Sequence, residues 1–243
     1  MLSVYWKEIS SFFSSLIGYI VIAVFLVMTG LFMWVFQDTS ILNYNYASLD
    51  QLFGLAPMIF LFLIPAITMR SFAEENQRGT IEFLATQPIS DLQIVLGKFL
   101  ANFTLVIFAL APTALYYYSV YQLGSPVGNL DSGGILGSYI GLCFLSGAFV
   151  AIGMWTSSLT NNQIVAFILG SFFCFTFHWA FGFISDLPMF SGMLSNSISK
   201  FGIAHHYDSI SRGVLDSRDI IYFVSIIFIF IMATLTSLSK RKW

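Results

Sequence analysis

The sequence has few charged residues for its length. Only 9% of its 243 residues are Asp, Glu, Lys or Arg, whereas a soluble domain carries about 25%. This shortage excludes a water-exposed surface over most of the chain. The net charge of -2 leaves no basic face to meet phosphates, which excludes nucleic acid as a partner. The two cysteines, Cys143 and Cys174, both lie in apolar runs, which excludes a disulfide framework and a zinc site.

Hydrophobic residues make up 57% of the chain, and aromatic residues 18%. They form long runs that contain no Asp, Glu, Lys or Arg. A helix needs about 20 apolar residues to span a membrane, so each run is predicted to cross it once. We expect an all-α integral membrane protein, with one domain over residues 1–243 and six spans at about 16–36, 52–69, 99–121, 135–159, 163–184 and 220–238.

Three of these runs have distinctive features. The first is longer than the ~7–15-residue apolar core of a signal peptide, and no A-x-A site follows it, so we expect a retained span. The second is the shortest and contains Pro57 and Pro65, which predicts a kinked or broken helix. Before the third, Ser90 and Gln93 have the spacing of a capping box, which predicts a helix start.

The positions of Lys and Arg predict the orientation, because cytoplasmic loops are enriched in basic residues. If both ends are cytoplasmic, the inner side holds Lys7, Arg70, Arg78, Lys98, Lys240, Arg241 and Lys242. The outer side then holds only Lys200, Arg212 and Arg218. We therefore expect both ends of the chain in the cytoplasm.

The inner segment 70–98 contains a dense group of charged residues between the second and third spans. Glu74, Arg78 and Glu82 repeat every four residues, so on a helix they form a polar stripe of alternating sign. Gly79 is expected to interrupt this helix or to let a neighbour approach closely, and Pro88 to end it. Helices that lie on lipid are rich in Lys and Arg. The Glu-rich stripe therefore favours a protein partner over the membrane surface.

The chain lacks the motifs of nucleotide binding and catalysis. At the Gly97-Lys98 pair, Leu92 and Phe99 stand where a phosphate-binding loop needs Gly and Ser or Thr. G-x-S-x-G, H-E-x-x-H and C-x-x-C do not occur. The spans also lack the midplane charges that ion-coupled transporters keep. We expect no enzymatic activity, no bound cofactor and no metal, and any driving energy must come from another chain.

The outer segment 185–219 is predicted to contain a short amphipathic helix. Its apolar residues fall at helical spacing, namely Ile203, Tyr207, Ile210 and Val214. Gly213 is expected to break this helix, and Asp216 or Ser217 to cap the sixth span. The adjacent His205 and His206 point about 100° apart on a helix, which does not favour a metal site.

Small residues mark the fourth span. Gly137 and Gly141 form a G-x-x-x-G, a spacing that lets helix backbones approach closely in lipid. Packing against the fifth span of the same chain is the favoured role of these glycines. The alternative, that they line a dimer interface or a transport pathway, stays open. In the fifth span, His178 is expected to be a packed residue beside Trp179.

One pattern in the inner segment carries a resemblance to a known family. It consists of Glu74-Glu75, residues 78–84 (RGTIEFL), residues 86–90 (TQPIS) and Leu96-Gly97-Lys98. This pattern, with six spans and both ends inside, resembles the permease subunits of ABC-2-type transporters. A closer similarity, over nearly the whole chain, is to the gliding-motility-associated ABC permeases of gliding bacteria. It includes residues 61–75, 116–121 and 157–160.

The resemblance implies a permease of the bacterial cytoplasmic (inner) membrane, surrounded by membrane lipid, that works with a separate ATPase subunit binding ATP and Mg. Its output is export or mechanical work linked to gliding. It implies a coupling helix in the inner segment, in contact with the ATPase through Arg70, Glu74, Glu75, Arg78, Gly79, Thr80, Glu82, Phe83, Thr86 and Pro88. It also implies a second membrane subunit with a large extracytoplasmic domain, or a homodimer. The outer partner is expected to dock at His206, Tyr207, Arg212 and Asp216.

Two other functions are weighed against this one. An intramembrane enzyme needs catalytic groups within the spans, and the sequence shows none. A structural membrane anchor that assembles a motility or secretion machine without transport stays open. ATP turnover separates this anchor from a permease, because a passive anchor leaves the ATPase rate of its partner unchanged.

Overall fold

A computed structural model describes residues 1–43, 47–80, 89–189 and 192–240, and every regular element in these ranges is helical. Six helical stretches are long and apolar enough to cross a membrane. They are Leu16–Trp34, Asp50–Arg78, Asp91–Leu123, Ser132–Leu159, Gln163–Ser185 and Ser217–Ser239. The predicted all-α fold with six spans is therefore confirmed, and the bounds differ mainly where the helices extend beyond the apolar runs.

Three spans are built from more than one helix. The second consists of α3 (Asp50–Thr68), which contains Pro57 and Pro65, followed by α4 (Arg70–Arg78). Neither proline breaks α3; the interruption lies at Met69. The third consists of α6 (Asp91–Leu110), a 3-10 turn (Ala111–Thr113) and α7 (Ala114–Leu123). The fifth consists of α9 (Gln163–Phe175), a π-helical turn (Thr176–Ala180) and α10 (Phe181–Ser185).

The fourth span, α8 (Ser132–Leu159), forms the centre of the bundle. It packs against α3, α9 and α13 (Ser217–Ser239), and 67% of its most apolar window is buried. The buried share of the most apolar window is only 22% in α2 (Leu16–Trp34) and 28% in α13. The first and sixth spans therefore leave most of their apolar side chains for contact with lipid.

The small residues of α8 serve packing within the chain, as favoured from the sequence, but their partner differs from the one expected. A Cβ on Gly137 would lie 2.8 Å from the carbonyl oxygen of Gly213, and one on Gly141 would collide with Ile210. Both partners belong to α12 (Ile203–Ile210) and the turn after it, not to the fifth span. The predicted amphipathic outer helix is confirmed as α12, which buries Ile203, Tyr207 and Ile210.

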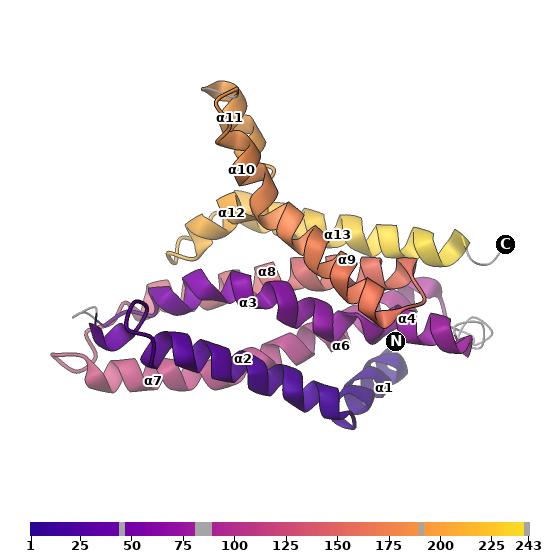
Figure 1. The fold of residues 1–243 in the computed structure, drawn as a ribbon, viewed down its shortest axis with the longest axis horizontal. Coiled ribbons are helices and arrows are strands. Elements are labelled where there is room, and N and C mark those ends of the chain that lie inside the picture. Colours follow the sequence, from indigo (N-terminus) through magenta and orange to yellow (C-terminus); the bar gives the residue numbers. More distant parts are fainter. Residues whose placement is uncertain (44–46, 81–88, 190–191, 241–243) are drawn as a thin grey trace.

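The N-terminus and the C-terminal end of α13 lie at the same end of the bundle as α4 (Figure 1). There, α1 (Leu2–Phe13) crosses the bundle at an angle to α2 and packs against α6. Farther along the bundle, α10 and α11 (Met193–Ser199) project away from it (Figure 1). A short 3-10 helix (Ile41–Asn43) follows α2. The end that carries α1 and α4 is the one predicted to face the cytoplasm.

Candidate functional site

Helix α4 is the part of the expected coupling segment that the structure describes. Phe72 and Ala73 are buried on the face of α4 that packs against the bundle, while Arg78 is exposed at the C-terminal end of the helix. The helix ends at Gly79, whose φ of 69° is left-handed, a conformation that glycine adopts at low cost. Gly79 therefore interrupts the helix, as predicted. No heavy atom of the described residues lies within 4 Å of a Cβ built on Gly79, so no neighbour packs closely on it.

The first turn of α4 is capped by a residue from another span. Its own N-cap position, Met69, has no capping side chain. Instead, the Ser157 hydroxyl on α8 accepts hydrogen bonds from the N–H groups of Phe72 and Ala73, both at 3.1 Å. The same hydroxyl donates to the Met69 carbonyl at 2.9 Å. Because free N–H groups at a buried helix start cost free energy, Ser157 fixes the position of α4 against the central helix.

A second attachment of α4 to α8 lies one turn farther on. The Asn76 side-chain amide donates to the Thr160 carbonyl at 3.1 Å, just beyond the end of α8. Together with the Ser157 contacts, it holds α4 against the inner end of the fourth span.

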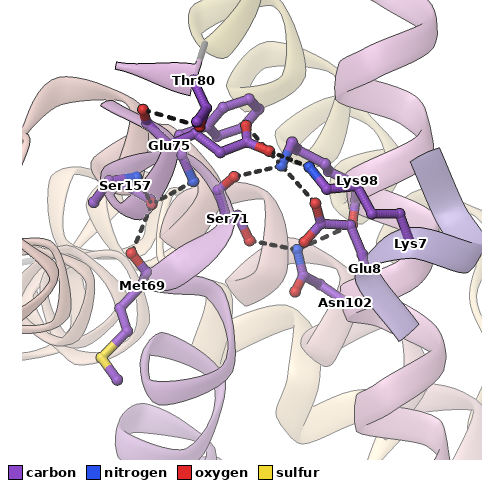
Figure 2. Close-up of polar contacts among 11 residues, drawn as sticks. Lys7, Glu8, Met69, Ser71, Glu75, Thr80, Lys98, Asn102 and Ser157 are labelled. Atoms are coloured by element: carbon purple, nitrogen blue, oxygen red, sulfur yellow. Dashed lines mark hydrogen bonds and ion pairs between the residues drawn. The ribbon is translucent and has the colours of Figure 1, made fainter. Parts of the chain in front are cut away.

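A charged network joins α4 to two further helices (Figure 2). At its centre is Lys98 of α6, which is only 1% exposed. Its ammonium group lies 2.7 Å from the Glu8 carboxylate of α1 and 3.1 Å from that of Glu75 of α4. It also donates to the Ser71 carbonyl at 2.6 Å. A buried ammonium is tolerated only when it is paired and hydrogen-bonded, and Lys98 satisfies both conditions.

Neighbouring groups extend this network. Lys7 donates to Glu75 at 2.8 Å, so the Glu75 carboxylate pairs with two lysines. The Asn102 amide, one turn after Lys98, donates to the Ser71 hydroxyl at 2.7 Å. Partial burial lowers the pKa of Lys7, but its hydrogen bond to Glu75 and the nearby carboxylates outweigh this, so its pKa is raised above 10.5. Lys7 is therefore charged at neutral pH.

The accessible side of α4 carries a simpler set of charges. Arg78 pairs with Glu74 at 2.7 Å, one helical turn away, and its side chain is 69% exposed. Arg70 lies 3.9 Å from the same carboxylate and donates to the Ser15 hydroxyl at 2.9 Å. Thr80 is exposed just beyond Gly79. This side of the helix is the one that a partner subunit can reach.

The structure brings together only some of the residues predicted to meet an ATPase. Arg70, Glu74, Arg78, Gly79 and Thr80 lie along α4 and its end. Four others, Glu82, Phe83, Thr86 and Pro88, lie outside the described residues.

The prediction for Glu75 is corrected. Its side chain is 11% exposed, and both of its carboxylate oxygens face lysines of the same chain. It therefore holds α4 to α1 and α6 and does not face a partner.

Of the four residues predicted to dock an outer partner, the structure exposes only some. Tyr207 is 3% exposed, and its hydroxyl donates to the Phe53 carbonyl at 2.8 Å, so it is a core residue and not a docking residue. The His206 ring lies 2.7 Å from the Asp219 carboxylate and stacks on Tyr222, so it joins α12 to α13. Only two of the four are exposed, Arg212 and Asp216. Asp216 also caps α13, as expected, by accepting from the Arg218 N–H at 2.9 Å.

His178 is packed, as expected. It is 3% exposed in the π-helical turn, and its ring lies 4.2 Å from that of Trp179. Among the described residues, no group of three His, Cys, Asp or Glu side chains could hold a metal ion.

The sequence did not predict that several polar residues make buried contacts between helices. Lys98 is predicted to be an inner charge and forms part of the Leu96-Gly97-Lys98 pattern, but its burial was not predicted, although the Ser90–Gln93 capping box, which is confirmed, places it inside a helix. Lys98 and Asn102 are four residues apart, so together they mark a polar face in the middle of this helix, which was a usable signal. For Ser157, no local signal existed, because its partners are distant in the sequence.

Comparison with known families matches the chain over most of its length. Residues 34–238 match a family described as ABC-2 family transporter protein. This range includes all of α4 and the spans from α3 to α13, and α1 precedes it. No curated protein compared with the chain matches it.

Proposed function

Because the chain belongs to the family of ABC-2 transporter proteins, we propose that it is a permease subunit that couples ATP hydrolysis by a separate ATPase subunit to movement of its spans. ATP and Mg bind to that partner and not to this chain. The output is export of a substrate or mechanical work, and the resemblance to gliding-associated permeases favours work linked to gliding motility in the bacterial inner membrane. A second membrane subunit with a large extracytoplasmic domain, or a second copy of this chain, completes the transporter.

The observation that carries the proposal is the way α4 is attached. One of its sides is bound to three other helices: to α8 through Ser157, to α6 through Lys98, and to α1 through the pair of Lys7 with Glu75. Its other side presents Arg78 paired with Glu74. A force applied to the free side is therefore passed to several helices at once.

This geometry supports a mechanism in which α4 moves as part of a rigid unit. Nucleotide binding brings two ATPase subunits together, and each displaces the α4 that it contacts. Since the buried charges of Lys98 and Glu75 lose favourable contacts if α4 moves alone, α6 moves with it. Such a movement about an interface switches the spans between two arrangements.

Co-purification tests the proposed partner. The tagged permease is expressed with its ATPase, and the complex is recovered in mild detergent. Reversing the exposed charge with Arg78→Glu places a second acid one helical turn from Glu74, so we expect a large loss of ATPase from the complex. The matched control is Arg218→Glu, which reverses an exposed arginine at the outer end of the bundle and should leave the yield unchanged.

The choice of residue matters, because Glu75→Lys removes a buried carboxylate between two lysines and so disturbs folding as well as binding. Wild-type recovery of the ATPase with Arg78→Glu contradicts the proposed docking side. An ATPase rate that does not change when the permease binds favours the passive anchor instead.

A further inference from the structure

A cavity of about 380 Å³ lies between α1, α4 and α6, beside the charged network. One part of its wall is polar and another part is apolar. Charged and polar side chains line one part, among them Lys7, Arg70 and Arg78, while Phe12, Ile67 and Leu105 line an apolar part. These three apolar side chains are at most 9% exposed. A ligand that fits both parts has a polar head and an apolar continuation.

The charges around the cavity do not balance. Among the described residues, its lining contains four basic side chains, Lys7, Arg70, Arg78 and Lys98, and three acidic ones, Glu8, Glu74 and Glu75. Lys98 and Lys7 pair with Glu8 and Glu75 at 2.7 to 3.1 Å, and Arg78 pairs with Glu74 at 2.7 Å. Arg70 lies farther from its nearest carboxylate, at 3.9 Å. The excess positive charge is therefore located at Arg70.

Arg70 also has a donor to spare. Its Nε is buried and has no hydrogen-bond partner among the described residues, while one of its terminal nitrogens donates to Ser15. The rest of the guanidinium is partly exposed and lines the cavity, so an anion in the cavity can accept hydrogen bonds from it. A guanidinium fits a phosphate particularly well, because it can donate two parallel hydrogen bonds.

The cavity lies where the helices leave the apolar part of the bundle. Arg70 directly follows the interruption after α3. Leu2 and Trp6 of α1 and Leu16 at the start of α2 are exposed apolar side chains at the same end. Tryptophan is enriched at the level of lipid headgroups. The phosphates of the surrounding lipid are therefore at the height of Arg70.

We infer that this cavity binds an anionic phospholipid through its phosphodiester group. The Arg70 guanidinium donates to the phosphate, and Phe12, Ile67 and Leu105 contact the carbon atoms that follow it. A headgroup with no positive charge of its own fits best, because one phosphodiester charge compensates the one excess positive charge of the cavity. The cavity shares Arg70 and Arg78 with the side of α4 proposed to meet the ATPase, but lipid binding is tested on the permease alone, so the two proposals can fail separately.

The test is a thermal unfolding titration of the purified, delipidated permease, followed by tryptophan fluorescence. The probe is a short-chain phosphatidylglycerol added below its micelle concentration. We expect saturable stabilisation of the wild type. Arg70→Gln should weaken the apparent affinity by about tenfold, as expected for loss of a charged hydrogen-bonding partner. The matched control, Arg218→Gln, removes the same charge from an exposed arginine outside the cavity lining and should change the affinity by less than about threefold.

Two further probes separate the sources of the phosphate. Glycerol 3-phosphate carries a phosphate without acyl chains, and short-chain phosphatidylcholine carries the phosphodiester with an added positive charge. Both should bind at least about tenfold more weakly than phosphatidylglycerol. Equal binding of glycerol 3-phosphate overturns the lipid assignment in favour of a free anion, and equal binding of phosphatidylcholine overturns the preference for an anionic headgroup.

A second, conservative variant keeps the test usable if the first variant does not fold. If Arg70→Gln does not fold, Arg70→Lys keeps the charge but loses the planar fork of donors, and a loss of affinity is still expected. Equal affinity in the wild type and the folded Arg70 variant overturns the inference. Equal losses in the Arg70 and Arg218 variants also overturn it, because they indicate a general charge effect and not a site.

Discussion

Replacing Lys98 by methionine removes the central charge of the network and keeps the helix propensity and most of the volume of the side chain. Removing one partner of a buried ion pair costs about 3–5 kcal/mol, because the other partner stays buried without compensation. Here Glu75 keeps its contact with Lys7 at 2.8 Å, and Glu8 is 18% exposed. We therefore expect the lower end of the range, about 3 kcal/mol.

Two comparisons give this prediction its specificity. Lys7→Gln removes a charge from the same network, but the Lys7 side chain is 55% exposed, so we expect a loss of about 1 kcal/mol or less. Adding Glu8→Gln to Lys98→Met removes the uncompensated carboxylate and should restore about 1–2 kcal/mol. The double variant should thus be more stable than Lys98→Met alone.

The assay is unfolding by SDS in mixed micelles, followed by tryptophan fluorescence, with each variant compared under the same lipid and detergent conditions. The reasoning is refuted if Lys98→Met costs no more than Lys7→Gln. It is also refuted if Glu8→Gln makes the Lys98 variant less stable still, since that outcome means that Glu8 has a stabilising partner other than Lys98.

Four further predictions use the same assay. Gly79→Ala should cost about 1 kcal/mol because of the φ of 69°, and Gly79→Asn less. Ser157→Ala should cost about 1–2 kcal/mol by removing the acceptor at the start of α4; Ser146→Ala, whose hydroxyl bonds within α8, is its control. Gly141→Leu should cost about 2 kcal/mol by displacing α12. Because folding raises the pKa of Lys7, its contribution should be constant at neutral pH and be lost above pH 10.5, where wild type and Lys7→Gln converge.

The spans were predictable because their signal is local. Each is a long apolar run, and the absence of water in the bilayer leaves the helix as the simplest way to satisfy its backbone. The start of α6 was also predictable, because Ser90 and Gln93 bond to each other's backbone. The end of α4 at Gly79 follows from one residue type and its backbone freedom.

The inward side of the site was not predictable in the same way. Glu74 and Glu75 are adjacent and identical in chemistry, yet one faces outward and the other meets two lysines. The difference depends on where α1 and α6 lie, and no local pattern contains that information. The same limit explains Gly137 and Gly141, whose spacing predicted close packing but not that α12 would supply the partner.

The cap at the start of α4 has a consequence for the order of biosynthesis. Ser157 follows Phe72 by 85 residues, so the ribosome completes α4 well before it makes the hydroxyl that caps it. Until the fourth span is inserted, the first N–H groups of α4 have no acceptor from α8, and the helix frays at the end that joins α3. A truncated or stalled chain therefore presents a poorly formed α4, and the surface offered to a partner reaches its final shape only after most of the membrane bundle has assembled.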